Sequence, residues 1–234
     1  MLIPSGSWGE DIAIDSSLVK LNLSKIQENI AHYNVKIIAV TKYFGLKAMM
    51  AGYEAGIRDF AESRAIESIE KIKQLPEEIK EKSTFHFIGH LQSNKADKVV
   101  KYFDVIHSVD SLKIASAISK SACSLNKREK ILLQINNAGE EQKSGYSKEQ
   151  LRFELKDLLS LEGLEIVGLM NMAPLGASED ELNFLFSDIK KFRDELEKES
   201  KISLPELSMG MSDDYKVAVK NGATMVRIGR KLFT

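Results

Sequence analysis

The chain alternates short apolar runs with longer amphipathic segments from about residue 15 to its carboxyl end. Short runs rich in β-branched residues are typical of buried parallel strands, and apolar residues three or four positions apart are typical of covering helices. The pattern predicts eight strands, at residues 36–42, 59–61, 84–89, 104–108, 131–136, 165–170, 206–209 and 224–228. Regular alternation of strands and helices is typical of α/β proteins with a parallel sheet.

Two of the predicted helices carry clear apolar stripes. The first stripe is Leu151, Leu155, Leu158 and Leu159, and the second is Leu182, Leu185, Phe186, Ile189, Phe192 and Leu196. Ser147 with Gln150, and Ser178 with Glu181, have the spacing of a capping box, in which each side chain satisfies the other residue's free backbone N–H. These pairs mark the starts of the two helices.

Eight strands in a chain of 234 residues favour a closed (β/α)8 TIM barrel over an open doubly wound sheet. A further amphipathic helix, at about residues 15–33 with Leu23, Ile26, Ile30 and Tyr33 on one face, is expected to cover the seam between the last and first strands. The chain ends at Thr234, so we expect no helix after the last strand. No linker-like segment interrupts the pattern, which predicts a single domain over residues 1–234.

Composition narrows the choice of partners. Lys and Arg total 33 against 34 Asp and Glu, so the net charge of -1 gives no reason to expect nucleic acid or an anionic membrane. Cys123 is the only cysteine, which excludes an internal disulfide. No signal peptide and no apolar stretch of membrane-spanning length are evident. We therefore expect a cytoplasmic protein that binds a small molecule.

The apolar run 36–42 ends on Lys42 and is followed by a turn at Gly45. The carboxyl ends of parallel strands are where barrels bind ligands. A partly desolvated lysine there loses its proton more readily and can act as a nucleophile. The alternative is an ordinary solvated lysine at a strand end.

Two further segments, 207–214 and 226–230, lie in the loops after the seventh and eighth strands, where barrels commonly bind phosphate. Gly210 permits a tight turn, and Ser212 is placed to cap a helix that ends near Gly222. Taken alone, Ser212 could be a simple helix cap and Arg227 half of a surface ion pair. Their convergence with Lys42 on one barrel face favours a ligand site.

Several segments together resemble the pyridoxal phosphate homeostasis protein family, whose barrel is similar to the N-terminal domain of alanine racemase. They occur in order at residues 36–42, 55–60, 86–95, 108–111, 168–170, 207–213 and 226–229, and the blocks 86–95 and 207–213 are the most specific. The resemblance implies a fold-type III barrel that binds pyridoxal 5'-phosphate (PLP) and lacks the C-terminal β domain of alanine racemase.

The resemblance also implies roles for individual residues. Lys42 would hold PLP as a Schiff base, while Ser212 and the backbone of Gly229 and Arg230 would hold its phosphate. Arg227, fifteen residues after Ser212, would face the pyridine nitrogen and keep it unprotonated, because two adjacent positive charges repel.

Two further contacts with the cofactor are expected. Met209 would belong to an apolar cover, although packing is the commoner role of such a methionine. Ser63 stands where many relatives have an asparagine that reaches the cofactor ring, and it can still donate a hydrogen bond, with a shorter reach.

The function implied is a carrier that buffers PLP for intracellular vitamin B6 homeostasis, supplies apo-enzymes that need PLP, and is expected to be a monomer. Racemases with this barrel use a second base, a tyrosine from a separate β domain, and this chain ends before such a domain, so little or no turnover is expected. The alternatives are a low-activity PLP-dependent racemase or decarboxylase, a barrel enzyme that forms a Schiff base with a sugar phosphate, and a non-catalytic interaction module.

The remaining candidates are two histidines and a lysine. His86 and His90 flank the end of the third strand without paired acidic ligands, so we expect no metal site and interpret His86 as a satisfied core residue. Lys143 lies on the loop after the fifth strand and could be a second, transient aldehyde acceptor or a solvated lysine.

Overall fold

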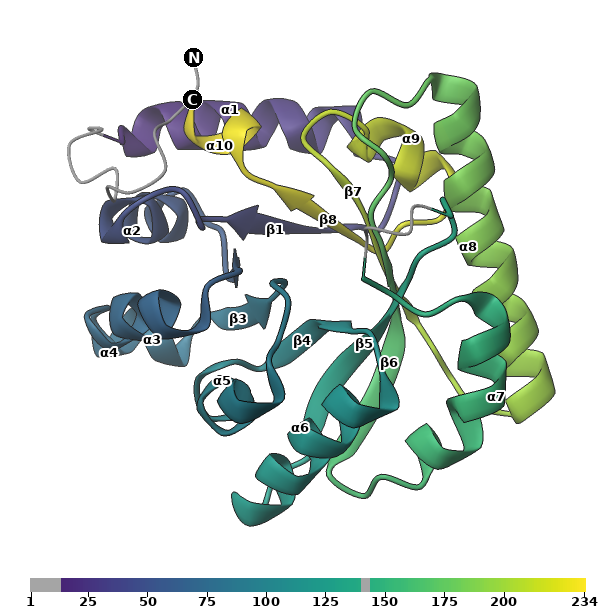
Figure 1. The fold of residues 1–234 in the computed structure, drawn as a ribbon. Coiled ribbons are helices and arrows are strands. Elements are labelled where there is room, and N and C mark those ends of the chain that lie inside the picture. The colour runs from purple at the N-terminus through teal and green to yellow at the C-terminus, as the bar shows by residue number, and fades with distance from the viewer. Residues whose placement is uncertain (1–13, 140–143) are drawn as a thin grey trace.

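Eight parallel strands close into a barrel in the computed structural model, which describes residues 14–139 and 144–234. Each strand pairs with the next along the chain, and β8 pairs with β1 to close the ring (Figure 1). The strands are β1 Lys36–Val40, β2 Asp59–Glu62, β3 Thr84–Phe87, β4 Val105–Val109, β5 Glu129–Ile135, β6 Leu164–Asn171, β7 Glu206–Met211 and β8 Met225–Ile228. The predicted barrel and all eight strands are confirmed.

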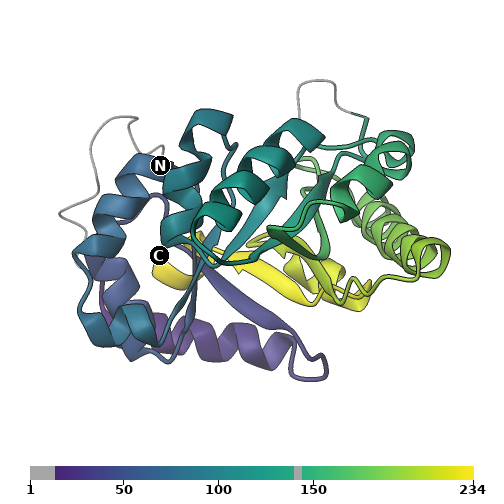
Figure 2. The same ribbon diagram turned by 90° about the horizontal axis from the view of Figure 1, so that it is seen from below.

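The helices surround the strands (Figure 2). They are α1 Ser16–Asn29, α2 Leu46–Glu54, α3 Ala65–Lys73, α4 Glu77–Glu81, α5 Ala96–Tyr102, α6 Leu112–Ser124, α7 Lys148–Leu159, α8 Glu179–Ser200, α9 Tyr215–Lys220 and α10 Arg230–Phe233, with a 3-10 turn at Ser93–Lys95. All six residues of the predicted α8 stripe are buried. In the α7 stripe, Leu159, the last residue of the helix, is instead 44% exposed. None of the described helices is both long and apolar enough to cross a membrane.

The two ends of the described chain meet at the seam of the barrel. Helix α1 packs against α2 and α10, which follow β1 and β8, so it covers the seam as predicted (Figure 1). The helix is shorter than predicted and ends at Asn29, with Ile30 as its C-cap and Tyr33 exposed. The prediction of no helix after the last strand was wrong, because the short α10 gives α1 a partner and accepts a hydrogen bond from Asn22 at the Leu232 carbonyl.

The caps of three helices differ from one another. Ser178 and Glu181 form the full predicted capping box at the start of α8. At the start of α7, the Ser147 hydroxyl accepts a hydrogen bond from the Gln150 N–H, which is one of the two bonds of the predicted capping box. Ser212 does not cap the next helix, because the chain makes an extra turn and α9 starts after Asp214.

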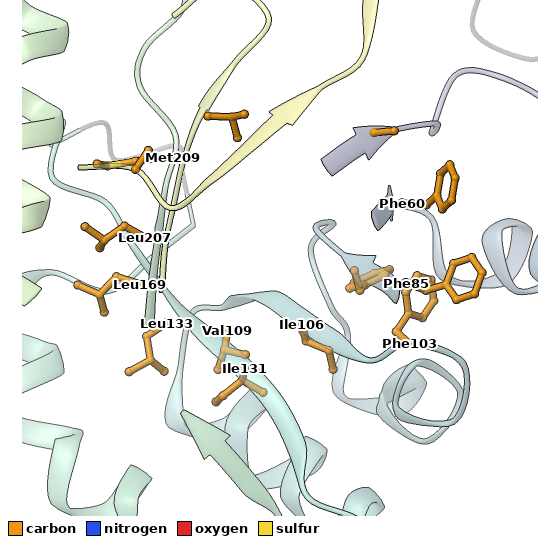
Figure 3. Packing of buried hydrophobic residues seen from close by; sticks show 14 of the residues in the cluster. Phe60, Phe85, Phe103, Ile106, Val109, Ile131, Leu133, Leu169, Leu207 and Met209 are labelled. Atoms are coloured by element: carbon orange, nitrogen blue, oxygen red, sulfur yellow. The ribbon is translucent and has the colours of Figure 1, made fainter. Parts of the chain in front are cut away.

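Side chains of each strand point alternately toward the surrounding helices and into the barrel interior. The large cluster between the strands and the helices includes Phe60, Phe85, Leu133, Leu169 and Leu207, all labelled in Figure 3. Two small clusters fill part of the barrel interior, one around Ile38, Val40, Ala61 and Met225 and one around Val105, Leu132 and Met170. The same interior faces of β3, β4, β7 and β8 carry the buried polar residues His86, His107, Ser208 and Arg227.

Candidate functional site at the carboxyl ends of the strands

The predicted lysine lies at the seam between β1 and β8. Lys42 follows the end of β1 by two residues and is half-buried, with its Nζ 5.0 Å from the centre of the Tyr43 ring. Strand register pairs Ala39 with Ile228, which brings Gly229 against Val40. A Cβ at Gly229 would lie 3.3 Å from the Val40 carbonyl oxygen, so glycine allows the two backbones this close approach. Lys42 therefore belongs to the same edge as the predicted phosphate loop.

A buried ammonium group holds the loop that carries Lys42. Lys71, on α3, donates from Nζ to the carbonyl oxygens of Thr41 at 3.0 Å and Phe44 at 2.8 Å. The same ammonium pairs with Glu62 at 2.5 Å, and both side chains are at most 5% exposed. Glu62 also accepts hydrogen bonds from the hydroxyls of Thr41 and Ser68. The backbone on both sides of Lys42 is thus fixed by one ion pair.

The loop after β7 is shaped by Gly210 and Asp214. Gly210 has φ of +92°, and a Cβ there would lie 2.6 Å from the Cβ of Ala218, so a side chain is excluded on two grounds. The Asp214 carboxylate accepts a hydrogen bond from the backbone N–H of Met211, and burial raises the pKa of this carboxyl. Ser212, inside this turn, is 7% exposed, and its hydroxyl has no hydrogen-bond partner among the described residues.

Arg227 is buried on β8 and contacts only uncharged oxygens through its hydrogen bonds. Its Nη1 donates to the carbonyl oxygen and to the hydroxyl of Ser208, both at 2.7 Å, and its Nη2 donates to the Asn171 carbonyl oxygen at 2.9 Å. Burial lowers the pKa of Arg227 to about 10, which leaves the guanidinium charged at neutral pH. Since Arg227 is 3% exposed, the interpretation of it as half of a surface ion pair was wrong.

Arg230 links the loops after β7 and β8, where phosphate binding was predicted, by a contact on the surface. Its exposed guanidinium pairs with Asp213 at 3.1 Å, which joins the start of α10 to the turn that holds Ser212. Arg230 is the first residue of α10, where backbone N–H groups have no acceptor within the helix. The loops after β7 and β8 therefore converge, with free N–H groups and the Ser212 hydroxyl on the same edge as Lys42.

Met209 lies near the carboxyl end of β7, with its side chain in the core. Its side chain is completely buried in the large core cluster and lies beside those of Leu207 and Leu169 in Figure 3. Successive side chains of a strand point to opposite faces, so Met209 faces the helices while Ser208 faces the barrel interior. The side chain of Met209 thus packs in the core, and its contact with the cofactor stays a prediction.

The other predicted residues have distinct positions. Ser63 follows β2 and is half-buried, and its backbone packs so closely on Gly89 that a Cβ there would clash. His86 is confirmed as a satisfied core residue, with no exposed surface and hydrogen bonds from both ring nitrogens, whereas His90 is exposed. Lys143 lies outside the described residues.

Sequence reasoning missed Glu62, Lys71, Ser208 and Asn171. The spacing of Lys71 was a signal. It lies three residues after Ser68 and next to Ile72, so it falls on the face of α3 that packs on the barrel. A signal for Ser208 was its place between Leu207 and Met209, which makes it the one interior-facing residue of that group. Neither signal identifies the partner, because the partners lie on other strands.

Comparison with known proteins defines the class of barrel first. Residues 14–234 match the family described as "Alanine racemase, N-terminal domain". An alanine racemase of Clostridium difficile has the same fold, with a TM-score of 0.74 over 94% of this chain and 57% of that chain, at 18% identity.

Two relatives are considerably more similar. A pyridoxal phosphate homeostasis protein of Synechocystis sp. is 46% identical over 200 residues, which cover 86% of this chain and 91% of that protein. The structure of PipY from Synechococcus elongatus with PLP bound matches with a TM-score of 0.84 and 38% identity, over 92% of this chain and all of that one. The chain belongs to the pyridoxal phosphate homeostasis protein family.

Proposed function

We propose that this protein binds PLP at the carboxyl ends of β7, β8 and β1 and carries it for vitamin B6 homeostasis. The observation that carries the proposal is the convergence of Lys42, Ser212, Arg227 and Gly229 on one edge of the barrel in a member of this family. Bound PLP supplies a reactive aldehyde, and a carrier protects that aldehyde from other amines.

The residues present fit this cofactor. The Ser212 hydroxyl, which has no partner among the described residues, and the N–H groups of Gly229 and Arg230 would bind the phosphate. Three of the five N–H donors of Arg227 are used in its described contacts, so donors remain for the ring nitrogen. The buried Oδ1 of Asn171 lacks a partner and lies on the residue whose carbonyl oxygen binds Arg227.

Lys42 would attach the cofactor covalently as a Schiff base, with loss of water between its ε-amino group and the aldehyde. The carbonyl contacts of Lys71 hold the Lys42 backbone in one position, so attachment requires rotation of a single side chain. Ser63, at the end of the neighbouring β2, would reach the ring edge.

We infer that amino-acid turnover is absent or slow. A charged Arg227 at the ring nitrogen disfavours protonation of that nitrogen, which weakens the ring as an electron sink. Curated relatives carry the name pyridoxal phosphate homeostasis protein, which fits a carrier. The partners would then be PLP and apo-enzymes that receive it inside the cell, with the carrier acting as a monomer.

The test is the visible absorption spectrum of the protein loaded with PLP, recorded before and after borohydride reduction and followed by peptide mass mapping. We expect a yellow species that bleaches on reduction and leaves a pyridoxyl mass on Lys42. A protein that takes up no PLP would overturn the proposal, and steady turnover of an amino acid would overturn the inference of a carrier without activity.

A further inference from the structure

A continuous row of polar side chains crosses the barrel interior from β2 to β8. The Asp59 carboxylate lies 3.0 Å from His86 Nε2, and His86 Nδ1 lies 2.8 Å from His107 Nε2. His107 Nδ1 lies 2.9 Å from the hydroxyl of Ser208, which accepts from Arg227 at 2.7 Å. His86, His107 and Ser208 have no exposed surface, and Asp59 is 17% exposed at the amino end of β2. The row therefore connects Arg227 with the opposite end of the barrel.

The chemistry of its two ends determines the direction of every hydrogen bond. A guanidinium only donates and a carboxylate only accepts. Burial acts to raise the pKa of Asp59, but the hydrogen bond from His86 and the Lys36 ammonium, 3.4 Å away, lower this pKa overall, so the acceptor is ionised. Arg227 then donates to Ser208, Ser208 to His107 Nδ1, His107 to His86 and His86 to Asp59. Both imidazoles are neutral and carry their proton on Nε2.

The reverse direction is disfavoured by the contacts of Ser208. It would require a protonated His86, a second buried positive charge in the same interior as Arg227. The Ser208 hydroxyl would then receive donors from both Arg227 and His107, with no acceptor among the described residues for its own hydrogen. Burial is the largest cause that holds the pKa of His107 well below its usual range, and the charges of Arg227 and Lys36 act in the same direction.

Among the described hydrogen bonds of Arg227, the one to the Ser208 hydroxyl can change with the orientation of that hydroxyl. The other two acceptors, the carbonyl oxygens of Ser208 and Asn171, are set by the backbones of β7 and β6. A hydroxyl can rotate, so whether it presents a lone pair or a hydrogen to Arg227 depends on His107. Aligned hydrogen bonds also polarise one another, which places the negative end of the row at the guanidinium.

We propose that Asp59, His86, His107 and Ser208 form a one-directional hydrogen-bond relay that positions Arg227 for the ring nitrogen of bound PLP. The inference rests on the proposed function for the ligand, and concerns residues that no comparison assigns. These four are positioning residues, because they act through Arg227.

The first test needs no ligand and measures the wild-type protein, with variants used only to assign its signals. The imidazole 15N shifts of the unliganded protein, assigned with His86→Gln and His107→Gln variants, report which nitrogen carries the proton. We expect both histidines to be neutral with the proton on Nε2. A charged His86, or a proton on Nδ1 of either residue, would overturn the relay whether or not PLP binds.

The second test breaks the relay beside Arg227. Ser208→Ala keeps the carbonyl contact and removes the hydroxyl, and we expect about tenfold weaker PLP binding with a shifted visible absorption maximum. Ser119→Ala is the matched control, because Ser119 is also buried and its hydroxyl accepts from the Gly163 N–H outside this row. Equal PLP affinity and spectra in wild type and Ser208→Ala would overturn the proposal, whereas failure of wild type to bind PLP would overturn the proposed function alone.

Discussion

Lys42 lies on a loop whose backbone is held by contacts that do not involve its own side chain. Thr41 and Phe44 on either side are buried and bonded to Lys71, whereas the Lys42 side chain is half-buried and packs near Tyr43. The chemistry proposed for Lys42 is therefore separable from the stability of the loop.

Lys42→Ala should abolish covalent PLP attachment and change the free energy of unfolding by less than about 1 kcal/mol, because few core contacts are lost. The reduced, PLP-treated protein would be mapped by mass spectrometry and its unfolding followed in urea. Lys47→Ala, which removes an exposed lysine of α2, is the control and should retain the label on Lys42. A folded Lys42→Ala variant that keeps one reducible bond would move the attachment to another lysine, and Lys143 would be examined first.

Glu129, the first residue of β5, makes stability depend on pH. Burial raises its pKa from an ordinary value of 4.5 to about 7, and the 2.6 Å ion pair with Lys127 opposes this shift only in part. Between these two pH values the folded state binds more protons than the unfolded state, so the free energy of unfolding falls as the pH rises.

Glu129→Gln removes this titration, and the stability of wild type relative to the variant should fall by about 2 to 3 kcal/mol between pH 4.5 and 7. Urea unfolding of both proteins across this range measures the difference, which cancels contributions from other groups such as His107. Glu162→Gln, at an exposed position, reports the general effect of removing one carboxylate. A difference that does not vary with pH would show that Glu129 has the same pKa in the folded and unfolded states, so that burial does not shift it.

At the scale of elements, α3 contributes more than a covering face. Its apolar residues pack on the barrel, and Lys71 on the same helix reaches the loop after β1 and the carboxylate at the end of β2. Removal of one partner of a buried pair leaves the other charge uncompensated, which is costlier than removal of both.

Lys71→Met should lower the free energy of unfolding by about 3 kcal/mol and weaken PLP binding, because the Lys42 loop loses its anchor. The double variant Glu62→Gln, Lys71→Met should recover part of the stability but not the affinity, since no donor then holds Thr41 and Phe44. Denaturant unfolding and PLP titration of the single and double variants separate the two effects. Equal PLP affinity in all of them would show that the Lys71 contacts with the loop do not contribute to PLP binding.

The two serine caps offer a comparison between helices of the same barrel. Ser178→Ala removes the hydroxyl that accepts from the Glu181 N–H and donates to the Glu181 carboxylate at the start of α8, and it leaves the bond from the backbone N–H of residue 178 to that carboxylate. The loss should cost about 1 to 2 kcal/mol, measured by urea unfolding. Ser147→Ala breaks the single cap bond of α7 and should cost less. A larger loss for Ser147→Ala would mean that tertiary packing, rather than the cap, holds the start of α8.

At the scale of the whole molecule, the strands were predictable because most of their residues are buried, so that each appears in the sequence as a short and mainly apolar run. The ends of α1 and the presence of α10 were not, because these helices contact each other across about 210 residues of chain. Likewise the strand-end positions of Lys42 and Arg227 follow from local pattern. The links of Arg227 to Ser208 and of Lys71 to Thr41 depend on strand register and helix placement, which no local pattern contains.

The proposed site uses residues from β1, β7 and β8, so it exists only when the ring is closed between the first and last strands. PLP should then stabilise the barrel as one unit. At a free concentration one hundred times the dissociation constant, the stabilisation is about 2.7 kcal/mol, which raises the melting temperature by roughly 5 to 10 °C for a chain of this size. Calorimetry of wild type with PLP, with inorganic phosphate as the control ligand, measures this shift. A second transition that PLP leaves unmoved would mean that part of the barrel unfolds independently of the site, and the closed ring would then not be the unit that binds.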